Sequence, residues 1–294
     1  MNNIFFLQED YIKNAGSLMQ LREDQLNAIL QNLETVNSND SLIKQALSWK
    51  EHIFKERDIF QNPSLSELHI PKIAPLLPVI VLAAGLGELK EFYSENNISN
   101  KIFSDTLFDV GRVMDECKGR NGSFVIEPPI FEWLCKHFRA QLFHIGRLQY
   151  EVIQFKEDNE FLKKGDYVIN IHIPAGGRMP YEEVCDSYRQ AAVFFEKLMP
   201  DYPIKYFICE TWMLSPQLRD ILDGSSNLIQ FLNDYELYGT SEDEGFYDSI
   251  FIKKPKDLNS LSEKTSLQRA IKEHLLSGKK LLSGRGCHLV EKWK

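Results

Sequence analysis

Residues 167–180, YVINIHIPAGGRMP, and the two segments that follow them decide the fold of this chain. YVINIHI at 167–173 places isoleucine at every second position, and this period predicts a β-strand. PAGGRMP at 174–180 predicts a tight loop, and residues 181–199 carry apolar side chains at helical spacing. Residues 205–214, KYFICETWML, predict the next strand. Strand, helix and strand in this order imply a right-handed parallel crossover.

Further strands and helices are expected on both sides of this crossover. IGRLQYEVIQF at 145–155 alternates polar and apolar side chains, which is the pattern of a half-buried strand. Ser215 followed by Pro216 is a helix-start signal. The elements expected around the crossover are a strand at 145–155, a short helix from Ser215 to about Leu222, strands at 227–237 and 248–252, and a last helix from Thr265 or Ser266 to about Gly278.

The N-terminal half predicts helices. Apolar residues recur at helical spacing within residues 26–33 and again within 103–114. Asp40 and Ser41 are expected to cap a further helix. The apolar stretch 76–92 is long enough for one buried helix, and a proline-rich irregular connection precedes it.

Two domains are expected from the length of 294 residues. Turn-forming residues in GRNGSFVIEPP at 119–129 mark the seam between them. We therefore expect a helical domain at 1–120 and a domain at 121–294 with a mixed β-sheet flanked by helices. The fold class is α/β for the second domain and α+β for the whole chain.

Composition excludes several classes of protein. Hydrophobic residues make up 43% and charged residues 26% of the chain, which excludes a disordered protein, a fibre and a coiled coil. The net charge of −8 argues against nucleic-acid binding. The longest apolar stretch is too short to cross a membrane, and the N-terminus lacks a basic leader. From this we expect a protein of a reducing compartment, the cytoplasm, without a membrane partner. Five cysteines without a CxxC pair argue against a disulfide framework and a zinc finger.

The charge is unevenly distributed. Residues 253–294 hold 11 Lys and Arg against 4 Asp and Glu, a net charge of +7, so the rest of the chain carries −15. One interpretation is a basic segment that lies on an acidic body. The other is a contact surface for a phosphate or for an acidic partner such as an acyl carrier protein.

Five short sequence motifs resemble those of a known protein family. GRLQYE at 146–151, HIPAGG at 172–177, WMLSPQL at 212–218, SNLIQF at 226–231 and TSLQRA at 265–270 resemble a bacterial acyltransferase family. Its members have a helical N-terminal domain and a GNAT-like C-terminal domain. The resemblance implies acyl transfer from a thioester such as acetyl-CoA, the co-substrate, to a small-molecule or peptide acceptor, with an amine as the expected nucleophile. The usual GNAT diphosphate signature is missing, and PAGGR stands in its place.

This PAGGR loop is the predicted cofactor-binding element. Backbone N–H groups at the start of a helix can hold a phosphate, and glycines let a ligand approach the backbone. Glu182 and Glu183, in the first turn of the predicted helix, would repel a diphosphate. The candidate cofactor-binding residues are Pro174, Ala175, Gly176, Gly177 and Arg178.

Polar residues on the strands are the other candidates. Glu210 is a candidate general base that Cys209 and Trp212 are expected to desolvate, and His172 is the alternative base. Tyr235 or Tyr238 could protonate the departing thiolate. Arg147, Gln149, Asn170 and Trp212 are the candidate substrate-binding residues, and Tyr238 completes the catalytic set with Glu210 and His172. The other interpretation, and the more ordinary one, is a sheet with one solvated face.

Two classes of chemistry are not expected. The seven histidines form no HxH or HExxH pair, so we predict no metal site. Cys185 and Cys209 are expected to be buried apolar residues rather than nucleophiles. The missing diphosphate signature keeps a second function open, a non-catalytic GNAT-like protein that binds a ligand or a partner.

Overall fold

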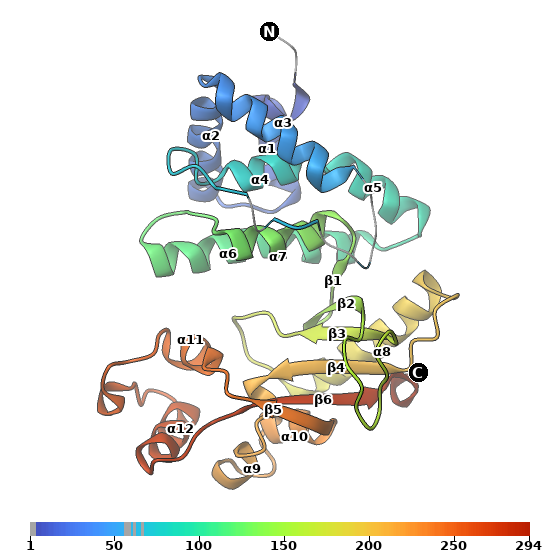
Figure 1. Ribbon diagram of the computed structural model, residues 1–294, viewed down its shortest axis with the longest axis vertical. Coiled ribbons are helices and arrows are strands. Elements are labelled where there is room, and N and C mark those ends of the chain that lie inside the picture. Colours follow the sequence, from blue (N-terminus) through green and yellow to red (C-terminus); the bar gives the residue numbers. More distant parts are fainter. Residues whose placement is uncertain (1–3, 56–59, 61–62, 66–67) are drawn as a thin grey trace. The chain divides into compact units, whose positions relative to one another are not determined.

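The computed structural model describes residues 4–55, 60, 63–65 and 68–294 (Figure 1). The chain divides into two compact units, Met1–His144 and Ile145–Lys294, so the division falls later than the expected boundary at 120/121. Helix α7 (Pro128–Phe138) belongs to the first unit because it is anchored there. His137 on α7 contacts the buried carboxylate of Asp109 at 2.9 Å.

The first unit is helical, as predicted. Its other elements are η1 (Phe5–Leu7), α1 (Glu9–Leu18), α2 (Glu23–Asn37), α3 (Asp40–Phe54), α4 (Leu77–Ala83), α5 (Leu86–Glu95) and α6 (Asn100–Asn121). Part of the proline-rich connection before α4, residues 66–67, lies outside the described residues.

Two local predictions in this unit were wrong. The residue that caps α3 is Asn39, whose side chain accepts hydrogen bonds from the N–H groups of Ser41 and Leu42. The single helix expected at 76–92 is two helices, α4 and α5, separated at residues 84–85. Every residue of α4 is buried, which agrees with the expected core position.

The second unit is a mixed sheet with helices. Its elements, with the strand that contains the division, are β1 (Leu142–Ile145), β2 (Leu148–Gln154), β3 (Tyr167–His172), α8 (Tyr181–Leu198), β4 (Tyr206–Thr211), η2 (Trp212–Leu214), α9 (Leu218–Ile221), α10 (Asn227–Asn233), β5 (Glu236–Ser241), α11 (Gly245–Phe251), η3 (Leu258–Ser260), α12 (Ser266–Leu276), β6 (Ser283–Leu289) and η4 (Val290–Trp293). The strand order is β1-β2-β3-β4-β6-β5. Strands β3 and β4 are parallel, which confirms the predicted crossover, and the pairs β2–β3, β4–β6 and β5–β6 are antiparallel.

Three strand assignments were wrong. Residues 227–233 form helix α10, because Ser226 caps it and Ile229, Phe231 and Leu232 are buried on one side. The strand there, β5, begins only at Glu236. Residues 248–252 belong mainly to helix α11, and strand β6 was missed.

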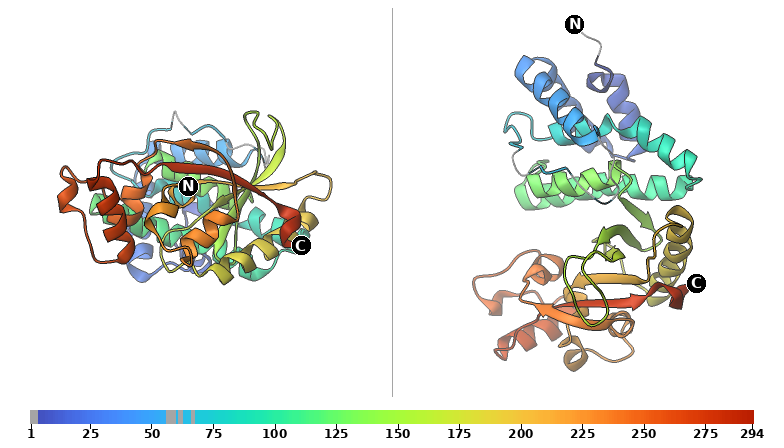
Figure 2. Two further views of the ribbon diagram at one scale, coloured as in Figure 1. Left: turned by 90° about the horizontal axis from the view of Figure 1, so that it is seen from below. Right: turned by 45° about the vertical axis from the view of Figure 1, so that its right-hand side comes forward.

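Strand β6 escaped prediction because it contains two glycines, which are rare in strands. A Cβ atom on Gly284 would lie 2.0 Å from the carbonyl oxygen of Leu214, so no larger residue fits there. Figure 2 shows α11 and α12 at one end of this sheet and the C-terminus at the other.

The two faces of the sheet differ. On one face Tyr188 of α8 packs against Phe207 and His288, with ring centroids 5.8 and 4.8 Å apart. On the other face Val168, Ile208 and Cys287 form an apolar cluster with residues of the β2–β3 connection. Within the described part of the chain, every helix is too short or too polar to span a bilayer.

Candidate active site

Strands β3 and β4 share only a short ladder. Their ladder pairs Ile169 with Phe207 and Asn170 with Ile208, and these are the only pairs within these two fully described strands. On its other side β4 stays paired with β6 over all six residues of β4. Beyond the ladder, Cys209 Sγ lies 3.4 Å from the carbonyl oxygen of Ile171. The backbone ladder therefore stops before the PAGGR loop, and a thiol contact continues beyond it.

The polar residues predicted on β2, β3 and β4 do share one face. Gln149 is paired with His172, and Glu151 with Asn170, so these four side chains lie on the same side of the sheet. Glu210 is two residues beyond Ile208, the partner of Asn170, and therefore lies on this side as well.

Glu151 connects this group. Its Oε1 accepts a hydrogen bond from Asn170 Nδ2 at 3.1 Å and lies 3.2 Å from Nε2 of His172. The Glu151 side chain is 7% exposed and that of His172 is 27% exposed. A buried carboxylate therefore orients an imidazole that solvent or a ligand can reach. Sequence reasoning missed this role of Glu151, because it depends on the register of two strands.

Gln149 holds a buried donor. The residue is 1% exposed, and within the described chain its Nε2 has no hydrogen-bond partner. Buried polar atoms normally have a partner, so this donor is available to a water molecule or a ligand.

The PAGGR loop exposes its backbone. Gly176 has φ +89° and Gly177 φ +76°, the left-handed region that glycine tolerates. Residues 175–178 are exposed, and within the described chain the N–H groups of both glycines donate to no protein acceptor. Successive N–H groups in such a turn form a concavity that suits an anion.

Arg147 has a different position from the one expected of a substrate-binding residue. Its guanidinium donates to the carbonyl oxygens of Pro174 at 3.2 Å, Gly176 at 3.3 Å and Arg178 at 3.0 Å. The side chain thus fastens the loop from the carbonyl side. Glu182 and Glu183 are exposed in the first turn of α8, directly after the loop.

The expected shielding of Glu210 was wrong. Its side chain is exposed, and Oε1 accepts a hydrogen bond from Ser241 at 3.1 Å. Cys209 cannot desolvate it, because neighbouring residues of a strand point to opposite faces. Trp212 is only 7% exposed and begins η2 after the strand has ended.

The two candidate tyrosines lie on different faces. Tyr238 of β5 packs against the apolar cluster, its ring centroid 5.3 Å from the guanidinium carbon of Arg285. Tyr235 is buried on the α8 side, where its hydroxyl lies 3.1 Å from that of Tyr188. Burial raises the pKa of both Tyr235 and Tyr238 above the usual range. Both phenols therefore hold their protons firmly.

The five cysteines are free and buried. Burial raises the pKa of the Cys209 thiol to about 12, which disfavours a nucleophilic thiolate. In the described residues, no group of three or more His, Cys, Asp or Glu side chains is placed to hold a metal ion.

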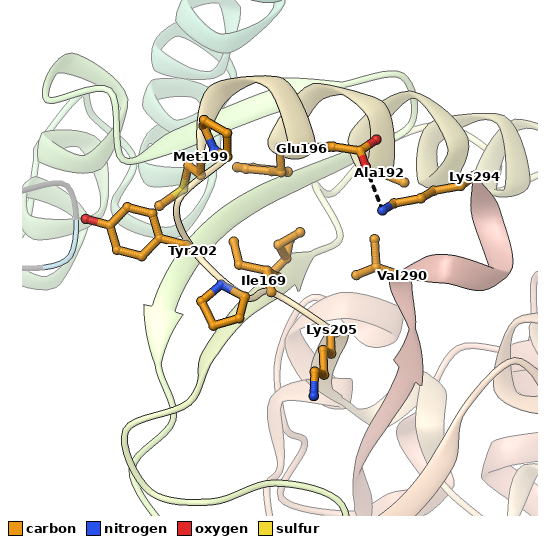
Figure 3. Close-up of a pocket in the computed structure, with 12 residues that line it drawn as sticks. Ile169, Ala192, Glu196, Met199, Tyr202, Lys205, Val290 and Lys294 are labelled. Atoms are coloured by element: carbon orange, nitrogen blue, oxygen red, sulfur yellow. Dashed lines mark hydrogen bonds and ion pairs between the residues drawn. The ribbon is translucent and has the colours of Figure 1, made fainter.

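A separate cavity of about 220 Å³ lies at the opposite end of β3 and β4 (Figure 3). Apolar residues line it, including Ile169, Met199 and Val290. Lys294 and Glu196 form an ion pair of 2.8 Å at its edge. None of the predicted site residues lines this cavity.

The basic segment 253–294 is largely neutralised by the acidic body. Its cations form ion pairs with acids outside the segment: Lys254 with Glu244, Lys280 with Glu242, Arg285 with Glu157, Lys292 with Asp234 and Lys294 with Glu196. These ion pairs support the interpretation that the basic segment lies on an acidic body.

Comparison with known families agrees with this architecture. Residues 142–288, half of the chain, match the GNAT-like C-terminal domain, and residues 11–140 match the N-acyltransferase N-terminal domain. The chain therefore belongs to the GNAT-like family, and the resemblance noted from its sequence motifs is confirmed. No curated protein sequence matches it.

Several solved structures have the same fold. An acyltransferase in complex with decanoyl-CoA matches with a TM-score of 0.77 at 21% identity, over 95% of this chain and 87% of that one. The same comparison gives 0.75 at 20% identity, with the same coverage, for an acyltransferase bound to decanoyl-CoA and teicoplanin. A mutant acyltransferase with octanoyl-CoA gives 0.76 at 20% identity, over 95% of this chain and 88% of that one. At these identities the likeness shows the fold.

Proposed function

We propose that this protein transfers an acyl group from an acyl-CoA-type thioester to an amine of a small-molecule acceptor. The observation that carries the proposal is the short β3–β4 ladder, which ends at Asn170 and Ile208 and is followed along the chain by His172, the partner of Glu151, and then by the exposed PAGGR loop. Similarly folded acyltransferases bind decanoyl-CoA, octanoyl-CoA and teicoplanin, which supports a CoA thioester and a small-molecule acceptor.

The residues present fit such a donor. The N–H groups of Gly176 and Gly177 and the side chain of Arg178 would hold the diphosphate. The unpartnered Nε2 of Gln149 would donate to a polar group of the donor or the acceptor. When bound, the acyl thioester supplies the electrophilic carbon and a thiolate leaving group.

His172 is the proposed general base. Nε2 lies 3.2 Å from both Glu151 Oε1 and Asn170 Nδ2, and in the proposed tautomer it donates its proton to Glu151, so Nδ1 is the basic nitrogen of the ring. Nδ1 takes the proton that the acceptor amine loses when its nitrogen bonds to the acyl carbon. The buried carboxylate of Glu151 stabilises the resulting imidazolium, and Nδ1 then returns the proton to the departing thiolate. The carbon–sulfur bond breaks in the same exchange, so no oxidant or metal is needed.

The other predicted catalytic residues have weaker geometry. Glu210 is exposed, and its carboxylate accepts a hydrogen bond from Ser241. Because no buried group of the described chain orients this carboxylate, Glu210 is only the second candidate for the general base. The raised pKa of Tyr238 makes its phenol a poor proton donor to a thiolate, whose conjugate acid is far stronger.

The test combines binding with turnover. Acetyl-, octanoyl- and decanoyl-CoA should each raise the melting temperature, because a ligand that binds only the folded state stabilises it. Release of free thiol should then depend on an added primary amine, and the search covers aliphatic, aromatic and sugar amines. A rise in melting temperature without thiol release across this panel would favour the non-catalytic alternative. No rise with any of the thioesters would contradict the proposal.

An acyl carrier protein is a second proposed donor. Lys253, Lys256 and Lys279 are exposed and form no ion pair within the described chain, so they remain for an acidic partner. If added salt lowers activity steeply with a carrier-bound donor but only slightly with acyl-CoA, the carrier protein is favoured as the donor.

The five buried free cysteines support the expected cytoplasmic location.

A further inference from the structure

We propose that Arg147 is a positioning residue that holds the PAGGR loop ready for the diphosphate of the donor. This inference rests on the proposed function. The residue itself does not touch the ligand, because its guanidinium is committed to the loop. Its three hydrogen bonds reach the carbonyl oxygens of Pro174, Gly176 and Arg178, at 3.0 to 3.3 Å.

The direction of these bonds gives the mechanism. A peptide unit presents its carbonyl and its N–H on opposite sides. Arg147 binds the carbonyl oxygens of Pro174, Gly176 and Arg178, so the N–H groups of the same three peptide units, those of Ala175, Gly177 and Met179, point away from its guanidinium. The glycines allow the positive φ values that this arrangement requires. Without the guanidinium of Arg147, these carbonyl oxygens would be free to turn toward the diphosphate, and their negative ends would repel it.

The position of Arg147 is itself fixed by α8. Arg147 lies in the two-residue turn between β1 and β2. Ser187, on α8, contacts this turn: its hydroxyl donates to the carbonyl of Ile145 and accepts from the N–H of Leu148 at 3.3 Å. It also lies 2.7 Å from the hydroxyl of Tyr150. Helix α8 thus fixes the β1–β2 turn through Ser187. Arg147 of this turn holds the PAGGR loop, which directly precedes α8.

The chemistry of Arg147 also accounts for a diphosphate loop that lacks the usual GNAT signature. A planar guanidinium with several fixed donors can hold three carbonyls at once, whereas an ammonium group offers one compact set of donors. The loop therefore obtains its shape from its own glycines together with a side chain of the β1–β2 turn.

The experiment compares donors with and without the diphosphate. Binding of CoA, 4′-phosphopantetheine and pantetheine is measured by calorimetry for the wild type, Arg147→Met and Arg147→Lys. We expect Arg147→Met to weaken CoA about tenfold. The same change should leave pantetheine within about twofold, and Arg147→Lys should recover only part of the loss. Arg189→Met removes an exposed arginine of α8 and serves as the charge-matched control.

A second measurement does not depend on ligand. Hydrogen exchange of the peptide that spans 174–180 should be faster in Arg147→Met than in the wild type, and Arg189→Met should leave it unchanged. In the turnover assay, Arg147→Met should raise KM for acyl-CoA while kcat and the acceptor KM stay within about twofold.

The outcomes separate two failures. Equal weakening of CoA and pantetheine in Arg147→Met, or no weakening of CoA, would overturn the role of Arg147 and leave the proposed function standing. Failure of the wild type to bind CoA would overturn the proposed function, and with it the purpose of the loop, before any variant is compared.

Discussion

Glu151 and His172 are diagonal neighbours on the adjacent strands β2 and β3, with the carboxylate Oε1 3.2 Å from the imidazole Nε2. The carboxylate is almost fully buried and the imidazole is not, so the pair has one anchored member and one member that faces outward. This arrangement suits a base that must keep one orientation while it exchanges a proton.

His172→Gln should lower kcat for acyl transfer about 100-fold or more, because it removes the basic nitrogen while it keeps a polar side chain. Glu151→Gln should lower kcat about tenfold, since the imidazolium that forms on His172 loses its counter-charge. His52→Gln and Glu160→Gln change exposed residues and are the matched controls. Full activity of His172→Gln would exclude it as the base and bring Glu210 forward.

Gln149→Met should separate stability from binding. The Gln149 amide has a buried donor without a partner, so an apolar side chain of similar shape should raise the free energy of unfolding by about 1 kcal/mol. The same change should weaken the binding of acyl-CoA or of the acceptor in calorimetry. Gln154→Met, near the exposed end of the same strand, is the control. Lower stability together with unchanged binding would show that the amide serves the fold.

The paired change of Glu182→Gln and Glu183→Gln should tighten CoA binding about two- to fivefold at low salt. Both acids are exposed in the first turn of α8, beside the proposed diphosphate loop, and they repel an anion there. Added salt should shrink the gain, because exposed charges are screened. Removal of Glu9 and Asp10, the first-turn acids of α1, should leave CoA binding unchanged. A gain that persists at high salt would rule out this electrostatic account.

His288 predicts a pH dependence of stability. Trp293 Nε1 donates to His288 Nδ1 at 2.9 Å, and burial lowers the pKa of this imidazole from 6.5 to about 3. The folded protein therefore keeps the ring neutral while the unfolded chain takes up a proton below pH 6.5. Stability is complete above that value and falls as the pH drops toward 3, by about 1.4 kcal/mol for each unit.

Urea unfolding of the wild type and of His288→Gln at pH 7 and pH 5 measures this contribution. Glutamine keeps an acceptor for Trp293 but does not titrate, so the variant should lose about 2 kcal/mol less than the wild type between the two values. His52→Gln, which changes an exposed histidine, should behave as the wild type. An equal loss in the wild type and His288→Gln would show that other groups cause the pH dependence.

Local patterns in the sequence predicted the centre of the second unit. The alternation around Asn170 and His172 gave the correct strand and the correct shared face, because the period of a strand is a local property. The strand–loop–helix–strand order gave the parallel crossover for the same reason.

Features that depend on distant contacts were not predictable in this way. The role of Glu151 needs the register of β2 and β3, and the role of Arg147 needs the β1–β2 turn to meet a loop that lies about 30 residues further along the chain. Residues 227–233 have apolar side chains that suit either a strand or a helix, and only the cap at Ser226 distinguished them. Strand β6 could not be recognised because it passes close to other backbone and needs glycine at 284 and 286. These glycines interrupt the alternation of side chains by which a strand is predicted.

The position of β6 has a consequence for biosynthesis. The strand occupies residues 283–289 of this chain, yet it pairs with β4 on one side and β5 on the other. β5 has no hydrogen-bonded neighbour other than β6 in the described sheet, so the nascent domain cannot complete its hydrogen-bond ladder until these late residues have emerged from the ribosome. The helical half, which is translated first, can fold during elongation, whereas the half with the proposed site must wait until residues 283–289 are available.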